Sequence, residues 1–340
     1  MLFDFYATGI GSVPFKDART ACSAIFDGFP AIPFWTQLPK RSFLENMYSQ
    51  FSEHMPGVVI DEANRTIHVD TTGVAETIEE VYRNYLDGNV EFFRMSEGFA
   101  AGFYGFVDSL GSSGATANVK CVKGHITGPI SYALSVTDEN KKAIIHDRDL
   151  FEVLTNVLAM KARWQARRLK KLFPSVIIFI DEPYIVSIGS SFININRDEA
   201  FGRLDEVIAA IKSEGALAGL HCCGNTDWPL LLKRNLDILN FDAYNFAKEF
   251  ALYAPDVKAF VGRSAAIAWG VVPSSEEIDG SAPKALAKRL DAAVKALADK
   301  GVTGPISSII TPSCGLGTLD EDRAKKIIDT TRELSSLLRK

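Results

Sequence analysis

The sequence predicts an α/β fold, a single (β/α)8 TIM barrel with an insertion after the early strands. Short runs of β-branched and aromatic residues alternate with longer amphipathic stretches, as expected of strands and helices that follow one another around a parallel sheet. Several short runs are apolar almost throughout, such as VIIFI at 176–180, which is typical of strands buried on both faces. A length of 340 residues suits one barrel that carries an insertion.

The predicted strands are short and rich in apolar residues, and they comprise residues 5–10, 31–34, 119–126, 176–180, 217–222, 238–241, 266–270 and 307–310. The predicted helices have amphipathic spacing, and they comprise residues 149–172, 197–213, 283–299 and 319–338. The last of these begins with an acidic run that complements the partial positive charge of a helix N-terminus. An open sheet with the same alternation remains the alternative architecture.

The segment 38–115 departs from this alternation because it is too long for one crossover between strands. It contains helical patterns and a predicted hairpin at 58–69, and we interpret it as an insertion that covers one end of the barrel. The GSSG sequence at 111–114 predicts a flexible turn, with an interdomain linker as the alternative. We therefore expect one domain over residues 1–340.

Composition and charge exclude several functional classes. The net charge of −5 and the lack of any Lys/Arg-rich block argue against a nucleic-acid partner. The N-terminal residues do not form a signal peptide, and no apolar stretch reaches the roughly 20 residues of a membrane span. Five scattered cysteines are too few for a disulfide framework. These features predict a soluble, cytoplasmic protein.

Polar residues follow the predicted strands one after another. They are Ser12, Thr127, Asp181, His221, Cys223, Asp242 and Cys314. In β/α barrels the C-terminal ends of the strands form the active-site face, so residues far apart in the sequence converge there. The positions of these residues predict a functional site at that face.

The strongest chemical signal is His221-Cys222-Cys223. Residues two apart on a strand point the same way, so His221 and Cys223 share a face and Cys222 points to the other. Imidazole and thiolate together suit zinc, and Cys314, in the sequence TPSCGLG, is the natural third ligand. A lone strand cysteine is more often a buried apolar residue, but a third thiol at another strand end favours a metal site.

The fourth zinc ligand is open to more than one interpretation. Asp242 is the best-placed oxygen ligand, with Glu249 and Asn245 as less favoured alternatives. A displaceable carboxylate or an open position is typical of catalytic zinc. The remaining cysteines, Cys22 and Cys121, are predicted to be buried and without a chemical role.

Two further motifs carry polar groups at strand ends. Asp181 and Glu182 follow a wholly apolar strand. They either bind a cation such as a substrate ammonium, or Asp181 caps the N-terminus of a helix. The spacing is equally compatible with both. The TGP sequence at 127–129 predicts a helix start whose N–H groups bind a carboxylate. Glu91 and Glu97 lie in the insertion, where a solvated helix face is the default interpretation.

These motifs resemble the catalytic domain of cobalamin-independent methionine synthase, in the barrel superfamily that also contains uroporphyrinogen decarboxylase. TGIGSVPF, VEFFRMSEGF, HITGPIS, IFIDEP, HCC, LNFDAYNF and TPSCGLG occur in that family's order over nearly the whole chain. The resemblance implies that zinc is held by His221, Cys223, Cys314 and a carboxylate at Asp242, where the family has glutamate. It also implies homocysteine contacts at Ile10, Ser12, Glu91 and Asp181.

The resemblance further implies a reaction. The typical enzyme carries a second, N-terminal barrel, which this sequence lacks, so the chain resembles the short core forms. It implies methyl transfer to the thiol of L-homocysteine, giving methionine, with Asp181, His221 and Cys223 in catalytic roles. The methyl donor expected for a short form is a methylated corrinoid protein.

Four alternatives remain open from the sequence. One is a methyltetrahydrofolate-dependent methionine synthase, and another is a zinc methyltransferase acting on a different thiol such as coenzyme M. Uroporphyrinogen decarboxylase uses no metal and needs arginines near the first strand, whereas the first arginine here is Arg19, inside a predicted helix. The fourth is a non-catalytic homocysteine-binding or corrinoid-binding component.

Overall fold

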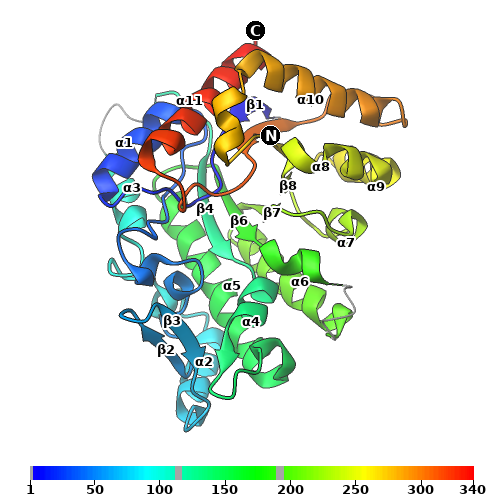
Figure 1. The fold of residues 1–340 in the computed structure, drawn as a ribbon. Coiled ribbons are helices and arrows are strands. Elements are labelled where there is room, and N and C mark those ends of the chain that lie inside the picture. Colours follow the sequence, from blue (N-terminus) through cyan, green and yellow to red (C-terminus); the bar gives the residue numbers. More distant parts are fainter. Residues whose placement is uncertain (1–2, 112–116, 189–194) are drawn as a thin grey trace.

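A computed structural model describes residues 3–111, 117–188 and 195–340 (Figure 1). Apart from Gly111, the predicted GSSG turn lies outside the described residues. Seven strands form one sheet in the order β1-β10-β9-β8-β7-β6-β4, and all neighbours in it are parallel. They are β1 Asp4–Ala7, β4 Val122–Thr127, β6 Val176–Asp181, β7 Leu217–Cys222, β8 Ile238–Phe241, β9 Ala266–Val272 and β10 Ser308–Pro312. The predicted α/β class with a parallel sheet is confirmed.

The eighth strand of the predicted barrel is not a regular strand. Residues 31–37 lie between the two edges of the sheet and make isolated contacts with both. On one side the Lys123 N–H donates to the Pro33 carbonyl at 2.9 Å, and on the other the Gln37 N–H donates to the Gly11 carbonyl at 3.0 Å. Pro33 has no N–H with which to continue a ladder. A complete eight-stranded barrel is therefore not confirmed, and we call residues 31–37 the seam of the sheet.

Helices surround the sheet on its outer side (Figure 1). They are α1 Ala18–Gly28, α4 Pro129–Ser135, α5 Arg148–Lys170, α6 Arg197–Ser213, α7 Trp228–Leu232, α8 Ala243–Phe250, α9 Ala254–Gly262, α10 Pro283–Ala298 and α11 Glu321–Leu338. The four predicted helices are confirmed as α5, α6, α10 and α11, with ends within one turn of those expected. Three of them begin at side chains that accept a hydrogen bond from the first turn, namely Asp147, Asn196 and Asp320.

The predicted insertion contains its own small elements. They are the 3₁₀ turns η1 Phe43–Glu45, η2 Ser49–Phe51 and η3 Val90–Phe93, the strands β2 Val58–Asp61 and β3 Thr66–Val69, and the helices α2 Ala75–Leu86 and α3 Ala101–Gly111. The predicted hairpin is confirmed as the antiparallel β2–β3 pair, which β5 (Thr137–Asp138) extends. Helix α3 packs against α1 and α2 packs against α5, so this segment is joined to the outer helices.

The core has two parts, one on each side of the sheet. Inside the curl of the sheet lies a cluster drawn from most of the strands and from the seam, including Ile32, Phe179, Ile238 and Ile309. The larger cluster fills the space between the sheet and the helices. Cys22 and Cys121 are buried in these cores, as predicted. Among the described residues, no helix combines the length and apolarity that crossing a membrane requires.

Candidate metal centre and substrate pocket

Three donor side chains converge at the C-terminal ends of the strands. His221 lies near the end of β7, Cys223 directly follows it, and Cys314 follows β10. One ligand atom from each lies within 4.8 Å of the other two. Cys222 points the other way, into the core beneath the helices, as the alternation along a strand requires. An imidazole nitrogen and two sulfurs are a donor set suited to zinc.

Asn240 fixes the orientation of the histidine. The side-chain amide of Asn240, on β8, donates to the Ala268 carbonyl at 2.9 Å and to Thr311 Oγ1 at 2.8 Å. Its oxygen is therefore the atom that faces His221, and it is hydrogen-bonded to His221 Nδ1. Nδ1 then carries a proton, so Nε2 is the nitrogen left to face the thiols, and it can bind a metal once it has lost its own proton. Nothing in the sequence pattern pointed to Asn240, except that it is a polar residue within the apolar strand ILNF.

The two thiols are electrostatically linked to each other and to the histidine. A hydrogen bond from Cys314 and a further one from His221 lower the pKa of Cys223 to about 4, against the effect of burial. The same bond raises the pKa of Cys314, which retains the shared proton. Burial lowers the pKa of His221, but its interactions with Cys223 and Asp181 outweigh burial and raise it. The lowered pKa of Cys223 favours its thiolate, the form that ligates metals.

Asp242, predicted as the oxygen ligand, lies outside this three-residue group. It caps the N-terminus of α8, where its carboxylate accepts from the Asn245 N–H at 2.9 Å and from the Asn245 side-chain amide at 2.7 Å. Burial raises the pKa of Asp242, against these two hydrogen bonds. Both of its oxygens are engaged by Asn245, so ligation by Asp242 requires at least one of these bonds to break.

A cavity of about 280 Å³ opens beside the three donors. Its walls come from the ends of several strands, from the seam and from the insertion, and the lining residues are Ile10, Ser12, Gln37, Pro39, Asn46, Met47, Asp181, Pro183, His221, Cys223, Cys314, Gly315, Gly317 and Thr318. The structure thus brings Ile10, Ser12 and Asp181 to the metal donors, as the sequence predicted. Gln37, Asn46, Met47 and Thr318 were missed, because their place depends on how loops cross the open face.

Asp181 and Glu182 have opposite roles, although they are adjacent in the sequence. Asp181 lines the cavity, and its Oδ1 has no hydrogen-bond partner among the described residues. Burial raises the pKa of Asp181 to about 6, against the attraction of His221 and Lys123. The unpartnered oxygen is available to a ligand, which favours the predicted cation-binding role over a helix cap by Asp181.

Glu182 is the residue that meets a helix N-terminus. Its carboxylate accepts from the Ile130 N–H at 3.0 Å, from the Ser131 N–H at 2.7 Å and from the Ser131 hydroxyl at 2.5 Å. A Cβ at Gly128 would lie 2.1 Å from this carboxyl group, so the close approach requires glycine there. The carboxylate site predicted at the TGP sequence therefore exists, but the protein's own Glu182 fills it.

Glu91 is not brought to the cavity, which corrects the substrate contact expected from the family resemblance. It is exposed on η3, where its carboxylate accepts from Trp164 Nε1 at 3.3 Å. The local structure explains this, because Phe93 of the same short turn is buried in the core and Glu91 is turned outward. Glu97 is exposed as well. The default interpretation of both residues as solvated is confirmed.

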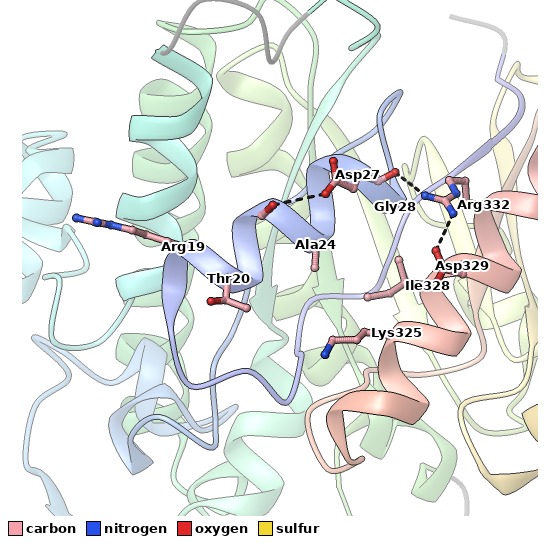
Figure 2. A pocket seen from close by; sticks show the side chains of 10 residues that line it. Arg19, Thr20, Ala24, Asp27, Gly28, Lys325, Ile328, Asp329 and Arg332 are labelled. Atoms are coloured by element: carbon pink, nitrogen blue, oxygen red, sulfur yellow. Dashed lines mark hydrogen bonds and ion pairs between the residues drawn. The ribbon is translucent and has the colours of Figure 1, made fainter.

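A second hollow, of about 550 Å³, lies on the outer surface between α1 and α11 (Figure 2). Arg332 in this hollow is engaged by its neighbours, because it donates to the main-chain carbonyl of Asp27 at 3.2 Å and to the Asp329 carboxylate at 2.8 Å. Arg19 points away from α11 in the same view. This hollow is larger than the cavity at the strand ends, but it contains none of the metal donors and no buried charged group aimed into it.

Comparison with known proteins identifies a shared fold. No protein-family model matches the chain, and no protein of curated function matches it. A solved structure of a B12-independent methionine synthase from Shewanella sp. W3-18-1, in complex with selenomethionine, superimposes with a TM-score of 0.60 at 14% identity, covering 100% of this chain and 98% of that one. A β-glycosidase from the hyperthermophile Thermosphaera aggregans gives a TM-score of 0.42 at 12% identity, covering 98% and 96% of the two chains, which is too low to support an argument.

Proposed function

We propose that this protein is a zinc-dependent methyltransferase that transfers a methyl group to the thiol of L-homocysteine, forming methionine. The observation that carries the proposal is the convergence of His221, Cys223 and Cys314 beside a cavity into which Asp181 projects. The similarity in fold to a B12-independent methionine synthase supports it, because the two chains match over nearly their full lengths. The activity proposed for this chain is inferred from its own residues and not from the activity of that neighbour.

The three donors fit a zinc ion by their chemistry and by their spacing. The hydrogen bond from Nδ1 of His221 to Asn240 leaves Nε2 for the metal, and the hydrogen bonds from Cys314 and His221 lower the pKa of Cys223, which favours its thiolate. Zinc bound by these residues would lower the pKa of a substrate thiol, so that the nucleophilic thiolate persists at neutral pH. Asp242 is the candidate for a fourth ligand, provided that it releases Asn245.

The chain's own side chains define the class of thiol. Among the described residues that line the cavity, Asp181 is the one with a formal charge besides the metal donors, and none is lysine or arginine. Asp181 thus binds the substrate ammonium, while Ser12 and Asn46, which line the same cavity, offer a hydroxyl and an amide to its carboxylate. Holding both ends of the amino acid aligns the sulfur for an in-line displacement.

This distribution of charge argues against coenzyme M as the thiol. Coenzyme M is an anion with no ammonium group, so Asp181 would repel it and no lining lysine or arginine would attract its sulfonate. A competition assay between the two thiols distinguishes them, because L-homocysteine should bind more tightly by at least about tenfold. Tighter binding of coenzyme M would contradict the amino-acid thiol.

The methyl donor is a separate question. A methylated corrinoid protein was expected for a short form, but the structural neighbour is described as B12-independent and does not support this donor. Our proposal therefore specifies the methyl acceptor and not the donor. Methylated corrinoid and methyltetrahydrofolate are each tested as the methyl donor in parallel assays. Methionine formation from one and not from the other identifies the donor.

The experiment that tests the proposal is the zinc content of protein purified without oxygen, wild type beside Cys314→Ser. We expect about one zinc per wild-type chain and loss or weakening of binding in the variant, because serine is a poor replacement for a thiolate ligand. Circular dichroism of both proteins controls for folding. Well-folded wild type that takes up no zinc, even after reconstitution, would overturn the proposal and favour a metal-free barrel enzyme.

A further inference from the structure

A lysine is buried inside the sheet directly behind the cavity wall. Lys123, the second residue of β4, is 0% exposed. Its Nζ lies 4.4 Å from the ring centroid of Phe179 and 5.3 Å from that of Phe34. Phe179 belongs to the cluster inside the curl of the sheet, so the lysine side chain points inward. Among the described residues no carboxylate lies within ion-pair distance of this group, and Asp181 attracts its charge from farther away.

The one hydrogen-bond acceptor that the described residues offer Nζ is the Ile10 carbonyl. Ile10 lies beyond the end of β1 (Asp4–Ala7), where the ladder has stopped and the seam provides only isolated bridges. An apolar side chain of similar length would occupy this interior position at much lower cost, because burying an ammonium group is unfavourable. The lysine therefore has to be explained by what it holds.

Three parts of the chain hold the cavity wall formed by residues 10–12, and Lys123 of β4 belongs to the first of them. The next carbonyl, of Gly11, accepts from the Gln37 N–H of the seam at 3.0 Å. Ser12 in turn accepts hydrogen bonds from the loop that carries Cys314: its carbonyl from Leu316 at 2.9 Å and its hydroxyl from Gly317 at 3.2 Å. Each residue of the wall is thus bonded to a different part of the chain.

We propose that Lys123 is a positioning residue of this site: from inside the sheet its ammonium group holds the Ile10 carbonyl, and so fixes the wall on which the amino-acid end of the thiol substrate is recognised. The inference rests on the proposed function, since it assumes a substrate whose sulfur meets the metal donors and whose other end lies on residues 10–12. Lys123 does not touch the substrate and acts through Ile10.

The test separates recognition of the amino-acid end from binding of the sulfur. Zinc-loaded full-length protein is titrated by calorimetry with L-homocysteine and with 1-propanethiol, which has a thiol and no amino-acid end. The quantity of interest is the ratio of the two dissociation constants. Lys123→Met removes the donor and the charge while it keeps a long side chain. Zinc content and thermal unfolding are measured on the same samples.

Lys161 provides a matched control. It is also 0% exposed, its Nζ also donates to a backbone carbonyl, that of Phe93 at 3.4 Å, and it lies on α5 outside the cavity. Lys161→Met therefore measures the general effect of removing a buried ammonium group. Any change common to both variants reflects this general effect and not recognition at the cavity.

We expect Lys123→Met to keep its zinc and to bind 1-propanethiol within about twofold of wild type, while L-homocysteine binding weakens at least about tenfold. Lys161→Met should leave the ratio unchanged. If the ratio in Lys123→Met equals that of wild type, the proposal is overturned. It is also overturned if both variants lose the same amount of affinity for L-homocysteine. Failure of both Lys123→Met and Lys123→Leu to fold, while Lys161→Met folds, would mark Lys123 as purely structural and also overturn it. Wild type that binds zinc but not L-homocysteine would instead refute the proposed function.

Discussion

At the scale of single residues, the site depends on side chains that prepare others for their role. His221 presents one nitrogen to the thiols because Asn240 holds the other, and Asn240 is held in turn by Ala268 and Thr311. Partners of this kind orient metal-binding histidines and raise their basicity. His221 is thus preorganised by residues of β8, β9 and β10 before any ligand arrives.

Replacing Asn240 by alanine should therefore weaken zinc binding without removing a ligand. The imidazole would lose the acceptor that fixes its tautomer and rotation, and we expect the zinc affinity to fall by about 10- to 100-fold. Competition with a chromogenic chelator measures this affinity. Asn240→Asp keeps an oxygen acceptor for Nδ1 and should lose less. Equal affinities in wild type and Asn240→Ala would show that the hydrogen bond does not control the metal site.

Asp181 leads to a prediction about the substrate and not the metal. Asp181→Asn removes the negative charge from the cavity while it preserves the shape of the side chain, so L-homocysteine should bind at least about tenfold more weakly. Zinc content should stay at the wild-type level, because Asp181 is not in the donor group. Calorimetry with L-homocysteine and with a thiol lacking an ammonium group measures the two effects separately. Unchanged homocysteine affinity would remove Asp181 from the substrate site.

Some residues of the site could be predicted from the sequence and others could not. His221 and Cys223 were predictable because the two-residue period of a strand is a local property, and Cys314 because its loop follows a recognisable strand. Gln37 and Asn46 were not predictable, because they reach the cavity through the seam and the insertion. Glu91 was misplaced, since a motif in the sequence does not determine which side of a short turn faces outward.

At the scale of elements, local chemistry determines the helices well. Helices α5, α6 and α11 begin at Asp147, Asn196 and Asp320, whose side chains accept hydrogen bonds from the first turn, and these signals are readable in the sequence. Residues 31–34, the first part of the seam, were predicted as a strand because their composition is that of one. Its pairing is irregular because Pro33 lacks an N–H and because the segment contacts both sheet edges, a property of tertiary structure.

The junction of β6 and α4 leads to a prediction about pH. Burial raises the pKa of Glu182 from 4.5 to about 7, against its hydrogen bonds with Ser131 and Ile130. The folded chain therefore binds this proton more tightly than the unfolded chain. The protonated Glu182 therefore contributes to the free energy of unfolding. This contribution is fully present below about pH 4.5 and is lost as the pH rises to about 7. Glutamine at this position stays neutral and should not show this loss.

Urea unfolding of wild type and Glu182→Gln at pH 5 and pH 8 measures the effect. The free energy of unfolding of the variant relative to wild type should rise between the two pH values, by roughly 2 to 3 kcal/mol. Titrating groups that do not interact with Glu182 cancel in the comparison, whereas Asp181, whose charge raises the pKa of Glu182, contributes to the difference. A relative stability that does not change with pH would mean that Glu182 stays ionised in the folded chain, held by the N–H groups of α4.

At the scale of the whole molecule, the metal donors join parts of the sheet that are not neighbours. His221 and Cys223 belong to β7 and the loop after it, and Cys314 follows β10, with β8 and β9 between these strands in the sheet. The loop after β10 is bonded to Ser12, so it also lies against the chain beyond β1. An ion held by the three donors would therefore tie the open face of the curled sheet together.

Zinc should accordingly stabilise the folded chain against heat. A ligand that binds only the folded state raises the free energy of unfolding by about 2.7 kcal/mol at a hundredfold excess over its dissociation constant. Differential scanning calorimetry of zinc-loaded and chelator-treated wild type should therefore show a higher Tm with zinc, by a few degrees. The double variant Cys223→Ser/Cys314→Ser lacks both sulfur ligands and should unfold at the same temperature with and without the ion. An equal shift in the double variant would place the stabilising zinc elsewhere on the protein, whereas no shift in zinc-loaded wild type would mean that the three donors do not act as a cross-link in the folded sheet.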